Sequence, residues 1–420
     1  PATVKNGENT YDVVSVGASA LKNSEVTELR LPDSVKTLQD NALYEASKLT
    51  TFEIPAGVES IGVNAIAGCA KLRSITYKEG SSLRKLGNGA LSDNTVLETI
   101  ALPNTLEDLG TYAMFYNYAL REVTFQEGSK WTTLPDGTFM RDVSLKKVNF
   151  PASVSTIGTQ AFWNCGALES INISGISEIG AQAFYNCASL SSVKLSDELT
   201  KLESGTFESC TGLKTVTLGK GLKVIGDMRQ TGEEELTGAF EGCTALGSIV
   251  LHDSVEEIGK NTFKGCSALK NIEMKPEAIK AIGANAFYDL ADDFIITVKN
   301  ENVKNMLVTV AFIEESHIKI ADNTTPAKTT VTLTSKGAGG IGMLAQVAAS
   351  NVPEGSWFLV QITNTAGVNS VYAVPVPESG TLDISYNTGN RITVWLTERQ
   401  PEMTAQTPNA GGRVYGSASL

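Results

Sequence analysis

Histidine is almost absent from this sequence, and so are the short motifs of several enzyme classes. Only two histidines occur among the 420 residues, and neither lies near a cysteine in the sequence. No Cys-x-x-Cys pair, Gly-x-Ser-x-Gly motif, phosphate loop or dinucleotide fingerprint is present. A zinc site, a Cys/His nucleophile and a nucleotide cofactor are therefore disfavoured, and we expect no enzyme activity and no catalytic, cofactor-binding or metal-ligating residues.

Positive charge and long apolar runs are also scarce. Lys and Arg number 34 against 46 Asp and Glu, which gives a net charge of −12. Nucleic acids and anionic membrane surfaces both require a positive face, so neither is expected as a partner. No apolar run reaches the 18 residues of a membrane span, so we expect no membrane insertion. The first ten residues hold neither an initiator methionine nor a signal-like segment, which indicates a processed or trimmed form.

What the sequence does contain is a repeat that fills three quarters of the chain. An apolar residue, usually followed by Gly, recurs every 22 to 25 residues, with one step of 33 residues. Self-similarity at such a period is typical of solenoids. The recurring position is occupied by Val16, Leu38, Ile61, Leu86, Leu109, Leu134, Ile157, Ile179, Leu202, Ile225, Ile258 and Ile282.

The clearest unit, residues 157–173, shows how one repeat should fold. Leu168, Ile171 and Ile173 have the period-2 pattern of a half-buried strand. The recurring Gly suits a tight corner with positive φ, and Phe162 should point into the coil. One coil cannot bury these residues by itself, but its neighbours can. The sequence therefore predicts a solenoid with a parallel strand ladder of about eleven to twelve coils.

At its most regular, the repeat reads Ile-Gly-x-x-Ala-Phe-x-x-Cys-x-x-Leu, and it resembles the BspA-like leucine-rich repeat family of bacterial surface proteins. The resemblance covers about residues 14–300 and is weaker where Leu43, Leu91, Met114 and Phe139 hold the Phe position without a following Cys. It implies a secreted or surface-displayed bacterial protein used in adhesion or host contact, with no catalytic residues to transfer.

The domain prediction has three parts. Residues 1–325 should form the leucine-rich-repeat solenoid with N-terminal and C-terminal caps, and residues 292–322 should supply the second cap with two strands and a short helix. Residues 326–400 alternate β-rich runs with Gly, Pro and Asn clusters, which predicts a small all-β, sandwich-like domain. Residues 401–420 read as a tail or a last strand. A ten-residue insertion near 227–236 is expected to be an exposed loop.

All six cysteines occupy one slot of the repeat, three residues after the Phe position. Other coils place Ser24, Ala46, Asn94, Asn117 or Asp142 there. A slot that accepts Ser, Asn and Asp suits a ladder that bonds to loop backbone. Stacked residues should also lie near the ~4.8 Å strand spacing, wider than a disulfide prefers. We therefore expect free structural thiols.

The residue after the Phe position indicates a candidate interaction patch. Four successive coils place Phe115, Met140, Trp163 and Tyr185 there, with Tyr116 close by. Stacked coils should align them into a ribbon, which either shields the turns by local stacking or contacts a protein or glycan. The exposed strand positions are mostly small and polar, so the sheet face is a weaker candidate.

These observations favour a non-enzymatic protein, exported to the extracellular space or cell surface, that mediates protein–protein contact or adhesion. Its partner would be a protein or glycan on a host or neighbouring cell surface. The alternative is a structural spacer whose C-terminal β domain binds glycan or cell-wall polymer. We expect a monomer without cofactors.

Overall fold

The computed structural model describes residues 3–6, 8–228 and 237–321, and beyond them the strands of a C-terminal unit with residues 366 and 376. Contacts divide the chain into two units, residues 1–320 and 321–420, which are described separately. The predicted insertion loop lies outside the described residues except for Asp227 and Met228, and so does the predicted boundary at 325/326.

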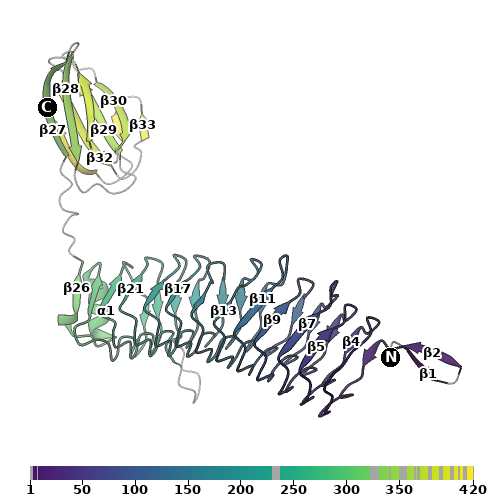
Figure 1. Ribbon diagram of the computed structural model, residues 1–420. Helices are drawn as coiled ribbons and strands as arrows, with labels where there is room; N and C mark the ends of the chain where they lie inside the picture. The colour runs from purple at the N-terminus through teal and green to yellow at the C-terminus, as the bar shows by residue number, and fades with distance from the viewer. Residues whose placement is uncertain are drawn as a thin grey trace. The chain divides into compact units, whose positions relative to one another are not determined.

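The first unit begins with an antiparallel hairpin, β1 (Thr3–Asn6) and β2 (Asn9–Asp12), and continues as a stack of coils (Figure 1). Each coil contributes a two-residue strand, and parallel pairing joins these strands into three successive sheets of five, three and four strands. These short strands are β3 (Ser15–Val16), β4 (Thr37–Leu38), β6 (Ser60–Ile61), β8 (Lys85–Leu86), β10 (Asp108–Leu109), β12 (Thr133–Leu134), β14 (Thr156–Ile157), β16 (Glu178–Ile179), β18 (Lys201–Leu202), β20 (Val224–Ile225), β22 (Glu257–Ile258) and β24 (Ala281–Ile282).

The twelve apolar positions of the repeat are the second residues of these twelve strands, and all are buried. Wherever two of the strands pair, the apolar residues lie directly opposite each other, as Leu38 does with Ile61 and Ile258 with Ile282. The predicted solenoid is therefore confirmed. Each apolar row continues from one coil to the next. Every coil therefore covers apolar side chains of its neighbour that a single coil would leave exposed to solvent.

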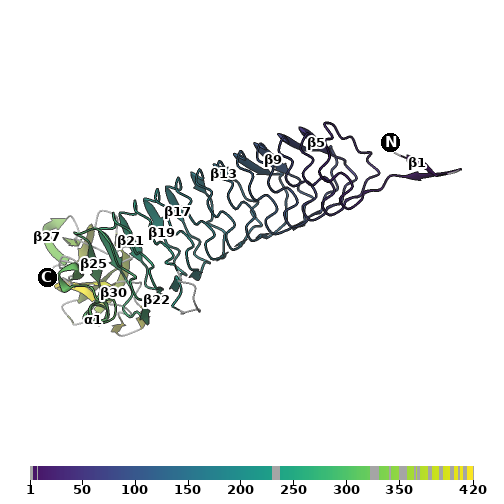
Figure 2. The same cartoon turned by 90° about the horizontal axis from the view of Figure 1, so that it is seen from below.

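A second parallel ladder runs along another side of the stack (Figure 2). In β5, Phe52 and Ile54 are buried while Thr51 and Glu53 are exposed, which is the predicted alternation of a half-buried strand. The strands are β5 (Thr51–Ile54), β7 (Ser74–Tyr77), β9 (Thr99–Leu102), β11 (Glu122–Phe125), β13 (Lys147–Val148), β15 (Ser170–Ile171), β17 (Ser192–Lys194), β19 (Thr215–Thr217), β21 (Ser248–Leu251), β23 (Asn271–Met274), β25 (Ile295–Val298) and β26 (Ile318–Ile320).

The solenoid has about 13 turns between residues 15 and 320, slightly more than the sequence predicts. The difference arises in the cap, where β25 and β26 continue the parallel ladder beyond β23. Helix α1 (Glu301–Thr309) and the 3₁₀ turn η1 (Glu315–His317) connect these two strands. The cap thus extends the solenoid by the same pairing that builds it.

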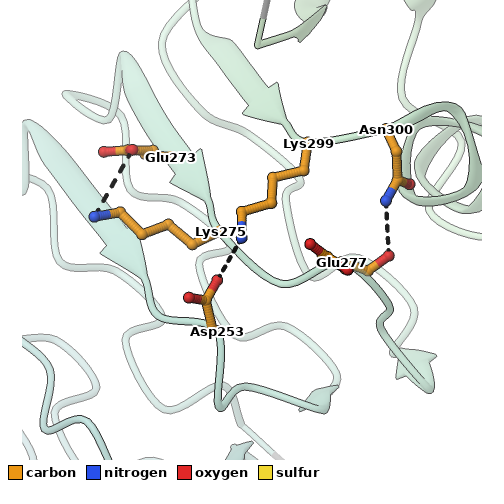
Figure 3. Close-up of polar contacts among 6 residues, drawn as sticks. All are labelled: Asp253, Glu273, Lys275, Glu277, Lys299 and Asn300. Atoms are coloured by element: carbon orange, nitrogen blue, oxygen red, sulfur yellow. Dashed lines mark hydrogen bonds and ion pairs between the residues drawn. The ribbon is translucent and has the colours of Figure 1, made fainter. Parts of the chain in front are cut away.

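Side chains tie the cap to earlier coils (Figure 3). The Asn300 side chain accepts the Val303 N–H at 3.1 Å as the N-cap of α1, and its Nδ2 donates to the Glu277 carbonyl at 2.9 Å. Lys299 Nζ lies 2.9 Å from Asp253 Oδ1, 46 residues earlier. The start of α1 is therefore fixed against the preceding coil.

The recurring Gly is needed for a different reason than the sequence suggested. Nine glycines directly follow the recurring apolar residue: Gly17, Gly62, Gly87, Gly110, Gly158, Gly180, Gly226, Gly259 and Gly283. Among them, only Gly226 has a positive φ, 82°. A Cβ built on Gly87 would lie 2.7 Å from the Gly62 carbonyl carbon of the preceding coil. At seven of the nine positions glycine is therefore required by the close approach of stacked backbones; the exceptions are Gly17, where a Cβ would meet nothing within 4 Å, and Gly226. The expectation of a left-handed corner holds at Gly226 and was wrong at the other eight positions.

Phenylalanine side chains form a continuous stack inside the coils. Phe162, Phe184 and Phe207 are fully buried, with ring centroids 5.2 Å apart and planes within 4° of parallel. The stack continues from Phe139 at one end to Phe287 at the other. Identical side chains at identical positions thus pack face to face, which confirms that Phe points into the core.

The described strands of the C-terminal unit are antiparallel, in a three-stranded sheet (β27–β28–β31), a four-stranded sheet (β30–β29–β32–β35) and a hairpin. The predicted tail holds the hairpin β33–β34 and the last strand, β35. The sandwich arrangement stays a prediction. The strands are β27 (Val331–Gly339), β28 (Gly342–Ala349), β29 (Trp357–Thr363), β30 (Asn369–Pro375), β31 (Thr381–Tyr386), β32 (Arg391–Thr397), β33 (Glu402–Thr404), β34 (Thr407–Asn409) and β35 (Val414–Ser419).

Candidate functional site

The aromatic ribbon predicted from the sequence lies on the turns that follow the Phe position. In each turn, the second residue after that position has a left-handed backbone, as Tyr116 (φ 64°), Arg141 (φ 63°) and Asn164 (φ 63°) show. This conformation reverses the chain tightly, and Asn tolerates it better than most residues do. The preceding residue, such as Trp163, is half-buried on the outer side of the turn.

Backbone hydrogen bonds keep successive turns in register. The Tyr116 N–H donates to the Met140 carbonyl at 3.0 Å, and the Arg141 N–H donates to the Trp163 carbonyl at 2.7 Å. The Asn164 N–H continues the series to the Tyr185 carbonyl at 2.7 Å. Side chains at equivalent positions are therefore held one above the next, because their backbones form a ladder of their own.

This ladder brings Trp163 and Tyr185 together as predicted. Their rings are stacked, with centroids 5.2 Å apart and planes 8° from parallel. On Trp163 lies the guanidinium group of Arg141, 5.0 Å from the ring centroid. The same guanidinium lies 5.2 Å from the Tyr116 ring, and Arg141 Nη1 donates to Tyr116 Oη at 2.6 Å. Arg141 thus joins aromatic residues of the two coils on either side of its own.

The remaining members of the patch surround Tyr116. Phe115 packs against Tyr116 with centroids 4.2 Å apart, and Tyr118 contacts it edge-on at 5.6 Å. Tyr112 lies edge-on to Phe115 at 5.8 Å. Met140 is half-buried in the same series of turns. We call the eight residues the aromatic patch: Tyr112, Phe115, Tyr116, Tyr118, Met140, Arg141, Trp163 and Tyr185.

Sequence reasoning missed Arg141, which connects the two halves of the aromatic patch. The signal was available, because Arg141 occupies the repeat position of Tyr116 in the next coil. The patch also exposes apolar surface at its edge: Tyr112 is 39% exposed and Tyr118 42%. Val143, at the repeat position of Tyr118 in the next coil, is 39% exposed. An arginine among half-exposed aromatic rings has the composition of a protein-binding hot spot.

Behind the aromatic patch, the cysteine slot forms the predicted ladder of free, buried thiols. Each thiol donates to the carbonyl of the Phe position in the preceding coil, as Cys187 does to Phe162 at 3.3 Å and Cys210 to Phe184 at 3.1 Å. Asn94 occupies the same slot, and its Nδ2 donates to Ile66 at 2.8 Å. The slot therefore satisfies backbone carbonyls that the turns leave unpaired.

Burial makes this slot unsuited to ionised groups. It raises the pKa of Cys69 to about 11 and the pKa of Cys210 to about 12. It also raises the pKa of Asp142 well above its usual value of 3.8. Thiols with raised pKa values are poor nucleophiles, so the cysteine ladder has a structural role.

The part of the chain that the structure describes contains no group of three His, Cys, Asp or Glu side chains placed to hold a metal ion. Among the same residues, no helix has the length and apolar character required to cross a bilayer.

Three comparisons relate the chain to known proteins. The profile of the BspA type leucine rich repeat region matches residues 14–133, 132–229 and 236–325. No curated protein matches the sequence. Among solved structures, a leucine-rich repeat protein from Bacteroides ovatus is 27% identical, covers 76% of this chain and 90% of its own, and superposes with a TM-score of 0.48.

Two further structures are more distant. The pneumococcal vaccine antigen PcpA is 20% identical over 77% of this chain and 88% of its own, with a TM-score of 0.42. A leucine rich cell surface protein from Faecalibacterium prausnitzii is 22% identical over 75% and 90%, with a TM-score of 0.39. The repeats and the profile together cover well over half of the sequence, and the chain belongs to the family of BspA-type leucine-rich repeat proteins.

Proposed function

We propose that this chain is a non-enzymatic, surface-displayed or secreted bacterial adhesion protein that binds its partner through the aromatic patch. The observation that supports this is the Arg141 guanidinium held between Tyr116 and Trp163 at the surface. No acidic side chain among the described residues forms an ion pair with Arg141, and its buried Nε has no hydrogen-bond partner there. The patch thus combines apolar area with an uncompensated positive charge.

The stacking favours a protein partner over a flat sugar ring. One face of the Trp163 ring is covered by Arg141 and the other by Tyr185. A sugar that stacks on an aromatic side chain needs an open face. Partner side chains can instead pack against ring edges and against Tyr112 and Tyr118, while a partner carboxylate pairs with Arg141. The partner is therefore a protein on a host or neighbouring cell surface, with a glycan as the less suitable choice.

The experiment measures binding of the full chain to arrays of host surface proteins and of glycans. Replacing Trp163 and Tyr185 together by Ser should weaken binding to any captured target at least tenfold, because hot spots contribute most of the binding energy. Replacing both by Phe should restore much of the binding. Tyr11→Ser is the matched control, since Tyr11 is 53% exposed on the N-terminal hairpin, outside the patch.

Two outcomes separate this proposal from its alternatives. If the Ser variants bind like the unmodified protein and remain folded, the aromatic patch only shields the turns. Binding that survives in those variants but is abolished by substitutions in residues 331–419 would favour a spacer with a glycan- or wall-binding C-terminal domain.

A further inference from the structure

A second apolar surface lies at the other end of the solenoid, on the C-terminal cap. Two of the large apolar side chains that the structure shows as exposed line the same pocket here, Tyr288 at 62% and Phe312 at 85%, and Val310, two residues before Phe312, is 46% exposed. Beside them is a pocket of about 570 Å³, within the range of ligand sites. The last coil provides one wall through Phe287 and Leu290, and the loop after α1 provides the other through Ala311 and Ile313.

Phe312 occupies a backbone conformation that does not suit it. Its φ is 56°, in the left-handed region, where a bulky residue is an outlier. The loop is fixed on both sides, because the Ala311 N–H donates to Met306 and the Ile313 N–H donates to Leu307 at 3.1 Å. Helix ends usually place Gly or Asn at a left-handed position. A phenylalanine here costs about 1 to 2 kcal/mol relative to glycine, although the residue is 85% exposed and gains little from burial.

The charge at the pocket has one sign. Asp289, Asp292 and Glu314 line it, and none of the three forms an ion pair with a basic side chain among the described residues. His317 is engaged inside the wall, since its ring is stacked on Phe294 at 4.1 Å and its Nδ1 contacts the Phe294 carbonyl at 2.8 Å. Lys264, on the neighbouring coil, is held by Glu241 at 2.9 Å.

We propose that this pocket binds a basic, apolar peptide segment of a partner protein, with Phe312 as the anchor. The aromatic rings of Tyr288 and Phe312 would pack against an aliphatic or aromatic residue of the segment. Asp289, Asp292 and Glu314 would pair with its Lys or Arg side chains. The strain at Phe312 identifies the anchor, and the three carboxylates, which have no basic partner among the described residues, identify the charge of the ligand. This site lies on other coils than the aromatic patch and does not depend on it.

The test titrates the full chain with a labelled synthetic peptide that alternates Lys or Arg with Leu and Trp. A second peptide carries Glu in place of every Lys and Arg. Phe312→Gly should weaken binding of the basic peptide at least tenfold, while the protein melts at or above the temperature of the unmodified chain, because glycine accepts this backbone without strain. The triple variant Asp289→Asn, Asp292→Asn, Glu314→Gln should lose affinity to a similar extent.

The chain carries a net charge of −12, so unspecific attraction of a basic peptide to the whole protein must be distinguished from binding at the pocket. The control replaces the exposed Glu25, Glu122 and Glu127 by Gln, which makes the same change in net charge elsewhere. This control should change affinity less than twofold. The proposal is overturned if the control weakens binding as much as the pocket variant, if Phe312→Gly has no effect, if the Glu peptide binds equally well, or if neither peptide binds. Self-association that Phe312→Gly abolishes would assign the pocket to a second copy of the chain and would also overturn it.

Discussion

Asp142 Oδ1 accepts the backbone N–H of Asn117 at 2.7 Å inside the core of the solenoid, 25 residues away in the sequence. Its second oxygen, Oδ2, is buried without a hydrogen-bond partner. Asn94 shows what this slot accommodates better: its Oδ1 accepts the Cys69 N–H at 3.0 Å and its Nδ2 donates to two carbonyls. The carboxylate at this position is a local defect in the ladder, as is Ser24 in the same slot, whose Oγ is also buried without a hydrogen-bond partner.

Asp142→Asn should therefore stabilise the protein at neutral pH. An amide at position 142 keeps the bond to Asn117 and adds a donor, so we expect the free energy of unfolding to rise by ~1 to 3 kcal/mol. Urea unfolding at pH 7 measures the change. Glu122→Gln, on the exposed face of β11, is the control and should alter stability little.

The same residue predicts a pH dependence. Burial raises the pKa of Asp142 well above 3.8, so folding favours the neutral acid. The stabilisation from this group is complete below about pH 3.8 and is lost as the pH rises through the raised pKa. The difference in melting temperature between Asp142→Asn and the unmodified protein should therefore be small at low pH and increase with pH. A difference that does not vary with pH would show that Asp142 is not buried as described.

The six cysteines should be unreactive in the folded protein. Burial raises their pKa values, to about 12 for Cys210 and Cys266, so little thiolate is available. Thiol titration should find almost no reactive groups in the native protein at neutral pH and six in denaturant without reductant. A value near zero in denaturant would mean that the cysteines are paired as disulfides.

Close stacking of the coils predicts a strong effect for one methyl group. In Gly87→Ala, the new Cβ would lie 2.7 Å from the Gly62 carbonyl carbon, so the backbones must separate. We expect a loss of ~1 to 3 kcal/mol in the free energy of unfolding, measured by urea titration. Gly247→Ala is the matched control, because a Cβ there meets nothing within 4 Å. Equal effects of the two substitutions would rule out close backbone approach as the reason for glycine.

Arg141 and Tyr116 should be energetically coupled. A double-mutant cycle with Arg141→Ala and Tyr116→Ala, which removes both the ring and the hydroxyl of Tyr116, measures their interaction without the effects of each change alone. The hydrogen bond and the cation–π contact together predict a coupling of ~0.5 to 2 kcal/mol. No coupling would mean that the side chain of Arg141 does not lie between the aromatic rings in solution.

Much of the solenoid could be predicted because its repeat is regular. The rows that contain Leu38 and Ile61 follow from spacing alone, since each coil must bury the same positions. The cap strands Ile295–Val298 and Ile318–Ile320 were also recognisable from their apolar pattern. The reason for glycine at position 87 could not be recognised from the sequence. Contact between stacked backbones depends on the distance between coils, which leaves no pattern within one repeat.

The two candidate sites also differ in how far the sequence predicts them, because one follows the repeat and the other does not. Trp163 and Tyr185 could be placed together from their common position in the repeat. Arg141 could have been found by comparing the following repeat position across the coils, where it lies next to Tyr116. The pocket at Phe312 had no such signal, because it depends on a left-handed backbone at the end of helix α1, which belongs to the cap and is not part of the repeat.

The most direct test of the stacked arrangement is the distance between spin labels at equivalent exposed positions of the second strand ladder, such as Glu53, Asn172 and Glu273. Glu53 and Asn172 are five coils apart, and Glu53 and Glu273 are nine coils apart. At ~4.8 Å per strand, the two pairs should be about 24 Å and about 43 Å apart. The unmodified protein, labelled in parallel, controls for reaction of the buried cysteines. Distances that increase in proportion to the number of coils are predicted, and two similar distances, as in a compact globule, would contradict the stacked solenoid.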